Sequence, residues 1–309
     1  MRQSAMLSAD SRTDEEGQAV VASNPSSVVR LRAILSSIKS DKGALIGFVI
    51  VATFAIVAIA EFVAQSVGFL LAPYNPIKTN VGPQYAAPSL AHLMGTDNLG
   101  RDVFSRIITA TPNDLGVSVA VIVFALVIGA IVGSYAAFHG GLLDEAIMRI
   151  TDIFFAIPAL VLAMSIALAL GPGITNMTVA LMIIWWPPYA RLARGEALKI
   201  AHQNYIEAAR LSGAGRTKII LKHALPNISL TLLVYASLDI GTVILVYAGL
   251  SYLGLGIRPP YPDWGQMVSA YQDFMLSYPW LPFFPGLIIA LGVIGFSLLG
   301  DGLKNTLMS

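Results

Sequence analysis

Long apolar runs alternate with shorter polar segments along most of this chain. A helix needs about 20 consecutive, mainly apolar residues to cross a hydrocarbon core about 30 Å thick. The runs that meet this length predict six transmembrane helices, at about residues 44–65, 114–138, 152–170, 173–190, 229–256 and 283–300. The expected fold class is therefore all-α, a polytopic membrane protein.

The polar segments divide the chain into regions. Residues 1–43 form a polar tail of mixed charge with few aromatics, and this composition predicts partial disorder. The other regions are the first span (44–65), a Pro- and Gly-rich loop (66–112), a core with the five remaining spans (113–303) and a short C-terminus (304–309).

Two features interrupt the core between its second and third spans and within the third. Gly140-Gly141 breaks the chain, and residues 142–149 then resemble a short interfacial helix. Pro158 lies inside the third span, where neighbouring helices can satisfy the carbonyl group that a proline leaves free. We expect one continuous span there.

Lys and Arg residues predict the orientation, because they are enriched in cytoplasmic loops. Residues 191–228 hold seven basic residues against two acidic ones, and residues 28–43 hold four basic residues. Residues 257–281 hold only Arg258. Six spans therefore place both termini and the 191–228 loop in the cytoplasm, and the 66–112 and 257–281 loops outside the cell membrane.

The composition supports a membrane protein and excludes several kinds of site. Hydrophobic residues make up 56% of the 309 residues and charged residues 12%, and the mean hydropathy is +0.71. Soluble domains have about 25% charged residues. The chain has no Cys, its four His are scattered, and it has no GxxxxGK[ST] phosphate-binding motif, so neither a metal site nor ATP binding is expected. Nucleic acid is not expected among its partners.

Residues 204–227, NYIEAARLSGAGRTKIILKHALPN, are a polar island among the apolar runs. They predict two short helices. Asn204 would cap the first helix with Glu207 completing a capping box, and Gly213 would end it in the left-handed conformation. Arg216 would begin the second helix, which Leu225-Pro226 would end.

The first of these helices presents a nearly bare ridge at Ala208-Ala209, which another protein could approach closely. From the residues alone, an amphipathic connector lying on lipid headgroups is equally plausible. The short helix and its small side chains favour a protein partner, because membrane-surface helices usually present bulky apolar residues.

The spacing of this island resembles the EAA loop of binding-protein-dependent ABC importer permeases. The matching pattern is Glu207-Ala208-Ala209, then Gly213, then His223-Ala224-Leu225-Pro226, where the family usually has Ile in place of His223. The dipeptide/oligopeptide subclass is similar at further segments, which together cover about residues 90–303: GTDNLGRDVFSR (95–106), FFAIPALVLAM (154–164), LSYLGLGIRPPYPDWGQM (250–267) and PWLPFFPG…LLGDGL (279–303).

The resemblance implies the fold of a type I ABC importer permease. Its expected partners are a homologous second permease, two ABC ATPase subunits that hold ATP and Mg²⁺, and an external substrate-binding protein. No cofactor is expected in this chain, which is not itself an enzyme. The residues expected to couple the chain to the ATPase are Glu207, Ala208, Ala209, Gly213, Leu225 and Pro226.

The chain departs from the subclass at two places. It has Ala110-Thr111-Pro112-Asn113-Asp114-Leu115 where Gly-Ala-Arg-x-Ser-Leu is usual, and Tyr247 where Glu is frequent. Asp239 lies within the fifth span, where a carboxylate costs about 2.5–3.5 kcal/mol on insertion scales. It should face a polar lumen or a partner helix, and a hydrogen-bonded contact between helices is slightly favoured over substrate contact.

Asp239, Tyr247, Trp185 and Trp186 are candidate residues of the translocation path, although tryptophans near a span end are commonly interface anchors. The resemblance predicts import of a short peptide. An oligosaccharide is the close alternative, because this aromatic run would suit a neutral, ring-stacking solute. A secondary transporter would need coupling carboxylates and internal repeats, and a membrane scaffold would not need the EAA spacing.

Overall fold

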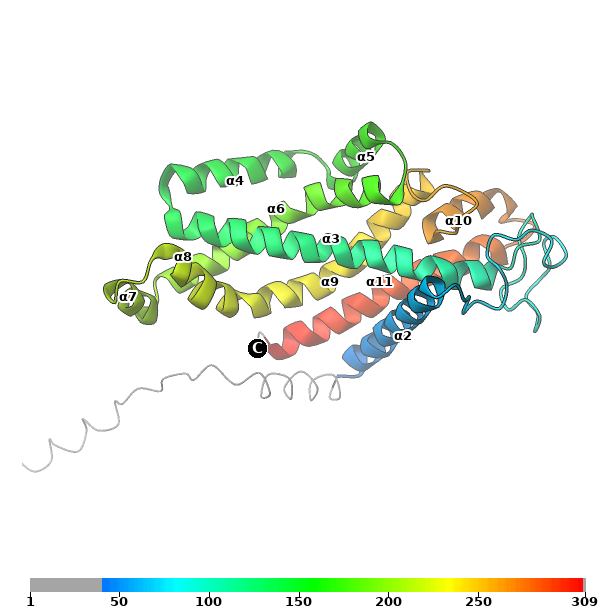
Figure 1. Cartoon of the computed structure of the whole chain (residues 1–309), viewed down its shortest axis with the longest axis horizontal. Helices are drawn as coiled ribbons and strands as arrows, with labels where there is room; N and C mark the ends of the chain where they lie inside the picture. Colours follow the sequence, from blue (N-terminus) through cyan, green and yellow to red (C-terminus); the bar gives the residue numbers. More distant parts are fainter. Residues whose placement is uncertain (1–40, 308–309) are drawn as a thin grey trace, which may run out of the picture.

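The computed structural model describes residues 41–307, which form an elongated helical bundle (Figure 1). The predicted disordered tail lies almost entirely outside these residues. The described chain contains no strand, only an isolated bridge between Thr96 and Asp102. The all-α prediction is therefore confirmed.

The helices follow one another with few long connections. In chain order they are α2 (Lys42–Ser66), α3 (Val103–His139), α4 (Gly141–Ala156), α5 (Ala159–Leu170), α6 (Ile174–Ala201), α7 (Asn204–Leu211), α8 (Arg216–Ile219), the π-helical turn η1 (Ile220–Ala224), α9 (Leu225–Tyr252), α10 (Trp264–Tyr271), the 3-10 turn η2 (Gln272–Phe274) and α11 (Trp280–Leu307). The loop between α2 and α3 and the helix α10 lie at one end of the bundle, which we call the α10 end, and α7 lies at the other, the α7 end (Figure 1).

Four helices of the described chain are long and apolar enough to cross a membrane: α2, α3, the continuous helix from Arg216 to Tyr252, and α11. The bent pair α4–α5 makes a fifth if it counts as one span. The predicted span at 173–190 lies within α6, which is 28 residues long but carries Arg191, Arg194 and Lys199 in its second half. α6 is not among the described helices that length and composition mark as spans, so the sixth span stays a prediction.

The third predicted span, 152–170, is not continuous. The chain bends by 91° between α4 and α5. Ile157, at the bend, has extended backbone angles (φ −109°, ψ 132°), because the ring of Pro158 disfavours helical geometry in the preceding residue. The predicted interfacial helix at 142–149 is the first half of α4, which continues to Ala156.

The second span begins earlier than predicted. α3 starts at Val103, capped by Asp102, and runs through Pro112 to His139. Its first ten residues were predicted to belong to the 66–112 loop. A proline inside a helix cannot donate to the carbonyl four residues earlier, here that of Ile108, and its ring crowds that carbonyl. A strongly packed helix can nevertheless continue through it, as α3 does.

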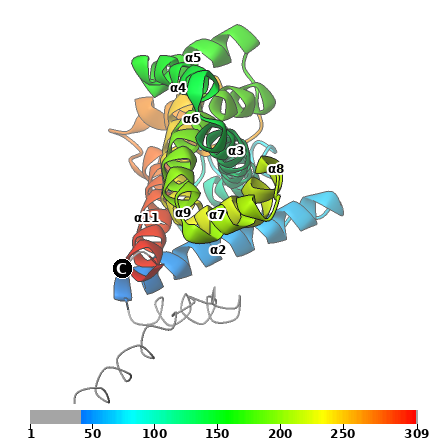
Figure 2. The same ribbon diagram turned by 90° about the vertical axis from the view of Figure 1, so that its left-hand side faces the viewer.

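Glycines bring the central helices α3 and α6 close together. Gly129 and Gly133 are four residues apart on α3, and a Cβ atom added at either would overlap the backbone of α6 at Tyr189 and Ala190. Small residues at this spacing let transmembrane helices pack at short distance. α2 lies on the opposite side of the bundle from α4 and α5 (Figures 1 and 2) and packs against α11 through Gly47.

Candidate functional site

The polar island forms a compact helix–turn–helix at the α7 end (Figure 2). Gly213 has a left-handed φ of +79°, as predicted, and the N–H of Ala214 donates to the carbonyl of Ala209 at 3.0 Å. The second helix begins at Arg216, also as predicted. The turn between the two helices is therefore tightly hydrogen-bonded.

The predicted capping box does not form. α7 already includes Asn204, and the capping position belongs to Gln203, whose side chain makes no cap hydrogen bond. The N–H of Glu207 donates instead to the backbone carbonyl of Gln203 at 3.2 Å. Because Asn204 lies within the helix, its side chain is not placed to cap the first turn, and the Glu207 side chain has no box to complete.

The second helix does not end at Leu225-Pro226. Residues 216–252 form one continuous helix, interrupted only by the π turn η1. Within this turn the N–H of Leu225 donates to the carbonyl of Ile220, five residues earlier. Pro226 has no N–H to donate to Lys222, and the wider turn accommodates this loss without breaking the helix. The loop is thus joined to α9 without a break in the helix.

The predicted coupling residues fall into two groups. Glu207, Ala208, Gly213 and Pro226 are exposed. Ala209 and Leu225 are half-buried against an apolar cluster, so they support the loop from within.

A fully buried member of that cluster is Ile206, which sequence reasoning missed. It is 0% exposed and packs with Phe138 of α3, Ala201 of α6, and Ile219 and Ala224 of the second helix. The sequence did contain a signal for it: Ile206 and Ala209 are both apolar and three residues apart, which places them on the same face of α7. This anchor leaves the opposite face of α7 free, and Leu211 at the end of α7 is 90% exposed.

Of the candidate path residues, Trp185 and Asp239 meet. The indole Nε1 of Trp185 donates to Asp239 Oδ2 at 2.7 Å, and the Tyr189 hydroxyl donates to the same oxygen at 3.3 Å. These bonds join α6 to α9 in the middle of the bundle. This geometry is a hydrogen-bonded contact between helices, which is the alternative slightly favoured for Asp239.

The other two candidates lie apart from this contact. Tyr247 is buried, and its hydroxyl donates to Asp263 Oδ2 at 2.9 Å, while Ser251 donates to the other oxygen. Burial raises the pKa of Asp263 above its usual range, and these hydrogen bonds oppose the shift. Trp186 packs edge-on against Phe154 of α4, with ring centroids 5.7 Å apart.

Residues of the GTDNLGRDVFSR segment (95–106) take part in a buried polar network at the α10 end. Asp97 Oδ2 accepts from Arg101 Nε at 2.7 Å and from the Tyr271 hydroxyl at 3.1 Å. Asp102 accepts from the backbone and side chain of Ser105 and contacts His92 Nδ1 at 2.9 Å. The segment therefore fixes the outer loop to α3 and α10.

Two further buried charges in α3 were not singled out by the sequence. Arg106 Nη1 donates to the carbonyls of Pro76 and Pro260, at 2.8 and 3.2 Å. Asp114 is buried, and neither of its carboxylate oxygens has a hydrogen-bond partner within the described residues. Both lie in the part of α3 that was predicted to be loop or span entry. No group of three metal-ligating side chains occurs in residues 41–307.

A family model described as "Binding-protein-dependent transport system inner membrane component" matches residues 125–307, which include the whole helix–turn–helix. The chain belongs to this permease family. The match covers α6, the loop and α9, so the permease shares with its family the elements that surround Ile206.

Similar permeases match most of the chain. The dipeptide transport system permease protein DppC of Alkalihalophilus pseudofirmus is 36% identical over 276 residues, 89% of this chain and 88% of the relative. A probable D,D-dipeptide permease of Escherichia coli is 41% identical over 77% of this chain and 80% of the relative. The nickel transport permease of the same species is 35% identical, over 82% and 91% respectively.

A solved structure supports the fold. A chain of the inward-facing MetNI methionine ABC transporter aligns with 63% of this permease and 93% of its own length, with a TM-score of 0.52 and 22% identity. At this identity the likeness shows the fold alone. It agrees with the predicted type I importer architecture.

Proposed function

We propose that this permease is the membrane-spanning subunit of an ATP-driven importer of short peptides, and that α7 is where its ATPase docks. The observation that carries the proposal is the construction of α7: one face is anchored by Ile206, and the other presents Glu207 and Ala208 to solvent. A partner that pushes on this exposed face would move the helices beneath it, because Ile206 contacts α3, α6 and the second helix of the loop.

The chemistry of the exposed face suits an ATPase surface with basic or hydrogen-bond-donating groups. Glu207 offers a carboxylate, Ala208 allows close approach, and Leu211 adds an exposed apolar group at the end of the helix. Gly213 then turns the chain out of the docking cleft. The continuous helix through η1 would transmit movement of the loop into α9.

Short peptides are the substrate class that the relatives favour. Two of the three similar permeases are named for dipeptides and the third for nickel. A glutathione transport permease of Pectobacterium atrosepticum is also 41% identical over 71% of this chain. None of these names supports the oligosaccharide alternative.

The proposed assembly follows from the topology. With α6 and the bent pair α4–α5 each crossing the membrane, six spans place both termini and the 191–228 loop in the cytoplasm. Two ATPase subunits would then bind there, one under this permease and one under a homologous partner permease, with ATP and Mg²⁺ held by the ATPases. The external binding protein would dock at the α10 end.

A charge reversal on α7 tests the docking site. We expect Glu207→Arg to abolish co-purification of the ATPase subunits with the permease, because the carboxylate would become a like charge facing basic groups. Glu145→Arg is the control, because the Glu145 side chain is 64% exposed on α4 and outside the loop. If Glu207→Arg retains the ATPase subunits and supports normal transport, the docking site is wrong.

A further inference from the structure

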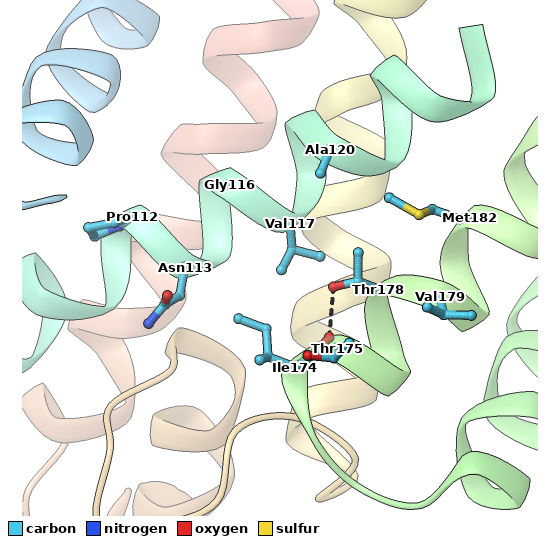
Figure 3. Close-up of a pocket in the computed structure, with 10 residues that line it drawn as sticks. All are labelled: Pro112, Asn113, Gly116, Val117, Ala120, Ile174, Thr175, Thr178, Val179 and Met182. Atoms are coloured by element: carbon cyan, nitrogen blue, oxygen red, sulfur yellow. Dashed lines mark hydrogen bonds between the residues drawn. The ribbon is translucent and has the colours of Figure 1, made fainter. Parts of the chain in front are cut away.

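A wide-open cavity of about 450 Å³ lies between α3 and α6, towards the α10 end of the bundle (Figure 3), and five of its ten lining residues are exposed. Its walls include Asn113, Gly116 and Val117 of α3, and Thr175, Thr178 and Met182 of α6. Pro112 lies beside it, in the segment where the chain departs from the peptide-permease pattern.

Asn113 is the most informative residue of the lining. Its side chain is exposed, and its carboxamide makes no hydrogen bond with any other described residue. The hydroxyl of Thr178, by contrast, donates to the carbonyl of Ile174 at 2.7 Å within its own helix. The carboxamide of Asn113 therefore has its donor and acceptor groups available to a ligand in the cavity.

The lining also restricts what can bind. None of its residues is charged, and none is a His, Asp or Glu, so the cavity offers no ligands of the kind that hold a nickel ion and no partner for a charged side chain. A carboxamide both donates and accepts hydrogen bonds, which matches the N–H and C=O of a peptide group. The apolar walls fit an uncharged side chain.

The position of the cavity connects it to the coupling loop. α6 contributes Thr175 and Thr178 near its start and reaches Ala201 at its other end, three residues before α7 begins. The Gly129–Gly133 contact holds α3 against α6 between these two points. α6 therefore connects the loop that carries α7 to one wall of the cavity.

We propose that this cavity is a substrate subsite, in which Asn113 hydrogen-bonds the peptide group of a transported peptide and the apolar residues of the lining contact an uncharged side chain. The inference rests on the proposed function, and it adds the place of contact and a selection for uncharged side chains. A bare divalent cation does not fit this subsite.

The absence of Cys from the chain makes a direct test possible. Asn113→Cys and Thr175→Cys are made singly in the reconstituted complex and treated with a charged, membrane-impermeant thiol reagent. Ile59→Cys is the control: Ile59 is 64% exposed on α2. It lies at similar depth, because nearby Glu61 accepts a hydrogen bond from Thr109 of α3 at 3.1 Å.

We expect both cavity cysteines to react with the reagent and the control cysteine to stay unlabelled. Alanyl-alanine, added with the binding protein, should slow the reaction of the cavity cysteines. Diglutamate should leave their reaction rate unchanged. No reaction at either cavity position overturns the subsite. Reaction that alanyl-alanine does not slow, in a variant that still imports it, also overturns the subsite but leaves the proposed function intact. Failure of the unaltered complex to import any peptide overturns both.

A kinetic variant gives independent evidence. Asn113→Leu should raise the KM for alanyl-alanine about fivefold, the equivalent of one neutral hydrogen bond, with ATPase subunits still bound. Asn113→Gln should recover part of that loss. An unchanged KM in Asn113→Leu contradicts the role of the carboxamide.

Discussion

Asp239 occupies the middle of α9, and its contacts explain why a carboxylate is tolerated there. Trp185 and Tyr189 of α6 both donate to its Oδ2. Asp239→Leu would leave the Trp185 N–H buried without an acceptor, which we expect to lower the free energy of unfolding by about 1–2 kcal/mol. Asp239→Asn keeps an oxygen acceptor and should lose less.

Unfolding of the purified permease in mixed micelles measures this difference. Equal stability of the wild type and Asp239→Leu would show that the contact between α6 and α9 contributes nothing. A large loss of transport with unchanged stability would instead place Asp239 in the translocation path, the role that was considered less favoured from the sequence.

Gly213 and Gly215 form a matched pair within the coupling loop. Gly213 has φ +79°, where a side chain costs about 1–2 kcal/mol, whereas Gly215 has φ −66°, which any residue adopts. Neither glycine has another atom within 4 Å of an added Cβ, so backbone strain alone distinguishes them. We expect Gly213→Val to impair ATPase binding and transport, and Gly215→Val to have little effect.

Transport assays and ATPase co-purification compare these two variants directly. Similar activity in both would mean that the left-handed turn does not position α7. The left-handed glycine was predictable because the end of a short helix, followed by a polar turn, specifically favours it. The position of the cap, at Gln203 and not at Asn204, was not predictable, because capping side chains and first-turn residues have overlapping preferences.

At the scale of elements, α6 connects the three features that matter for function. It lines the cavity at its start, contacts Asp239 of α9 at its centre and leads into α7 at its end. The contact with α3 near Gly133 is therefore expected to keep these features in register.

Gly133→Ala tests this packing with a single methyl group. A Cβ added at Gly133 would overlap the backbone of Ala190, whereas a Cβ added at Gly195, on α6, would meet open space. We expect Gly133→Ala to lower the thermal midpoint and transport, and Gly195→Ala to raise helix stability slightly, because alanine is the better helix former. Equal midpoints for the two variants would refute the close approach.

The helices themselves were largely predictable, since long apolar runs specify spans wherever no competing signal occurs. The predicted first and sixth spans lie within α2 and α11. The predicted fifth span, 229–256, runs four residues beyond the helix that ends at Tyr252. Prolines account for most of the differences: Pro158 bends the chain, whereas Pro112 and Pro226 are absorbed within helices. Local preference is the same at all three, and packing decides the outcome.

At the scale of the molecule, the bundle carries distinct machinery at its two ends. The α10 end is fixed by the buried network around Asp97 and Asp102, and the α7 end carries the exposed face of α7 that we propose as the docking site. The network could not be predicted in detail, because its partners lie far apart in sequence: Asp97 and Tyr271 are separated by 174 residues. The EAA spacing, in contrast, is local and was readable directly.

Peptide uptake into proteoliposomes tests the central claim most directly. The vesicles contain the full complex of permease subunits and ATPases, with binding protein on the side of the α10 end and ATP on the side of α7. We predict uptake of labelled alanyl-alanine only when both ATP and binding protein are present. Uptake that proceeds without ATP, driven by an ion gradient, would contradict the account.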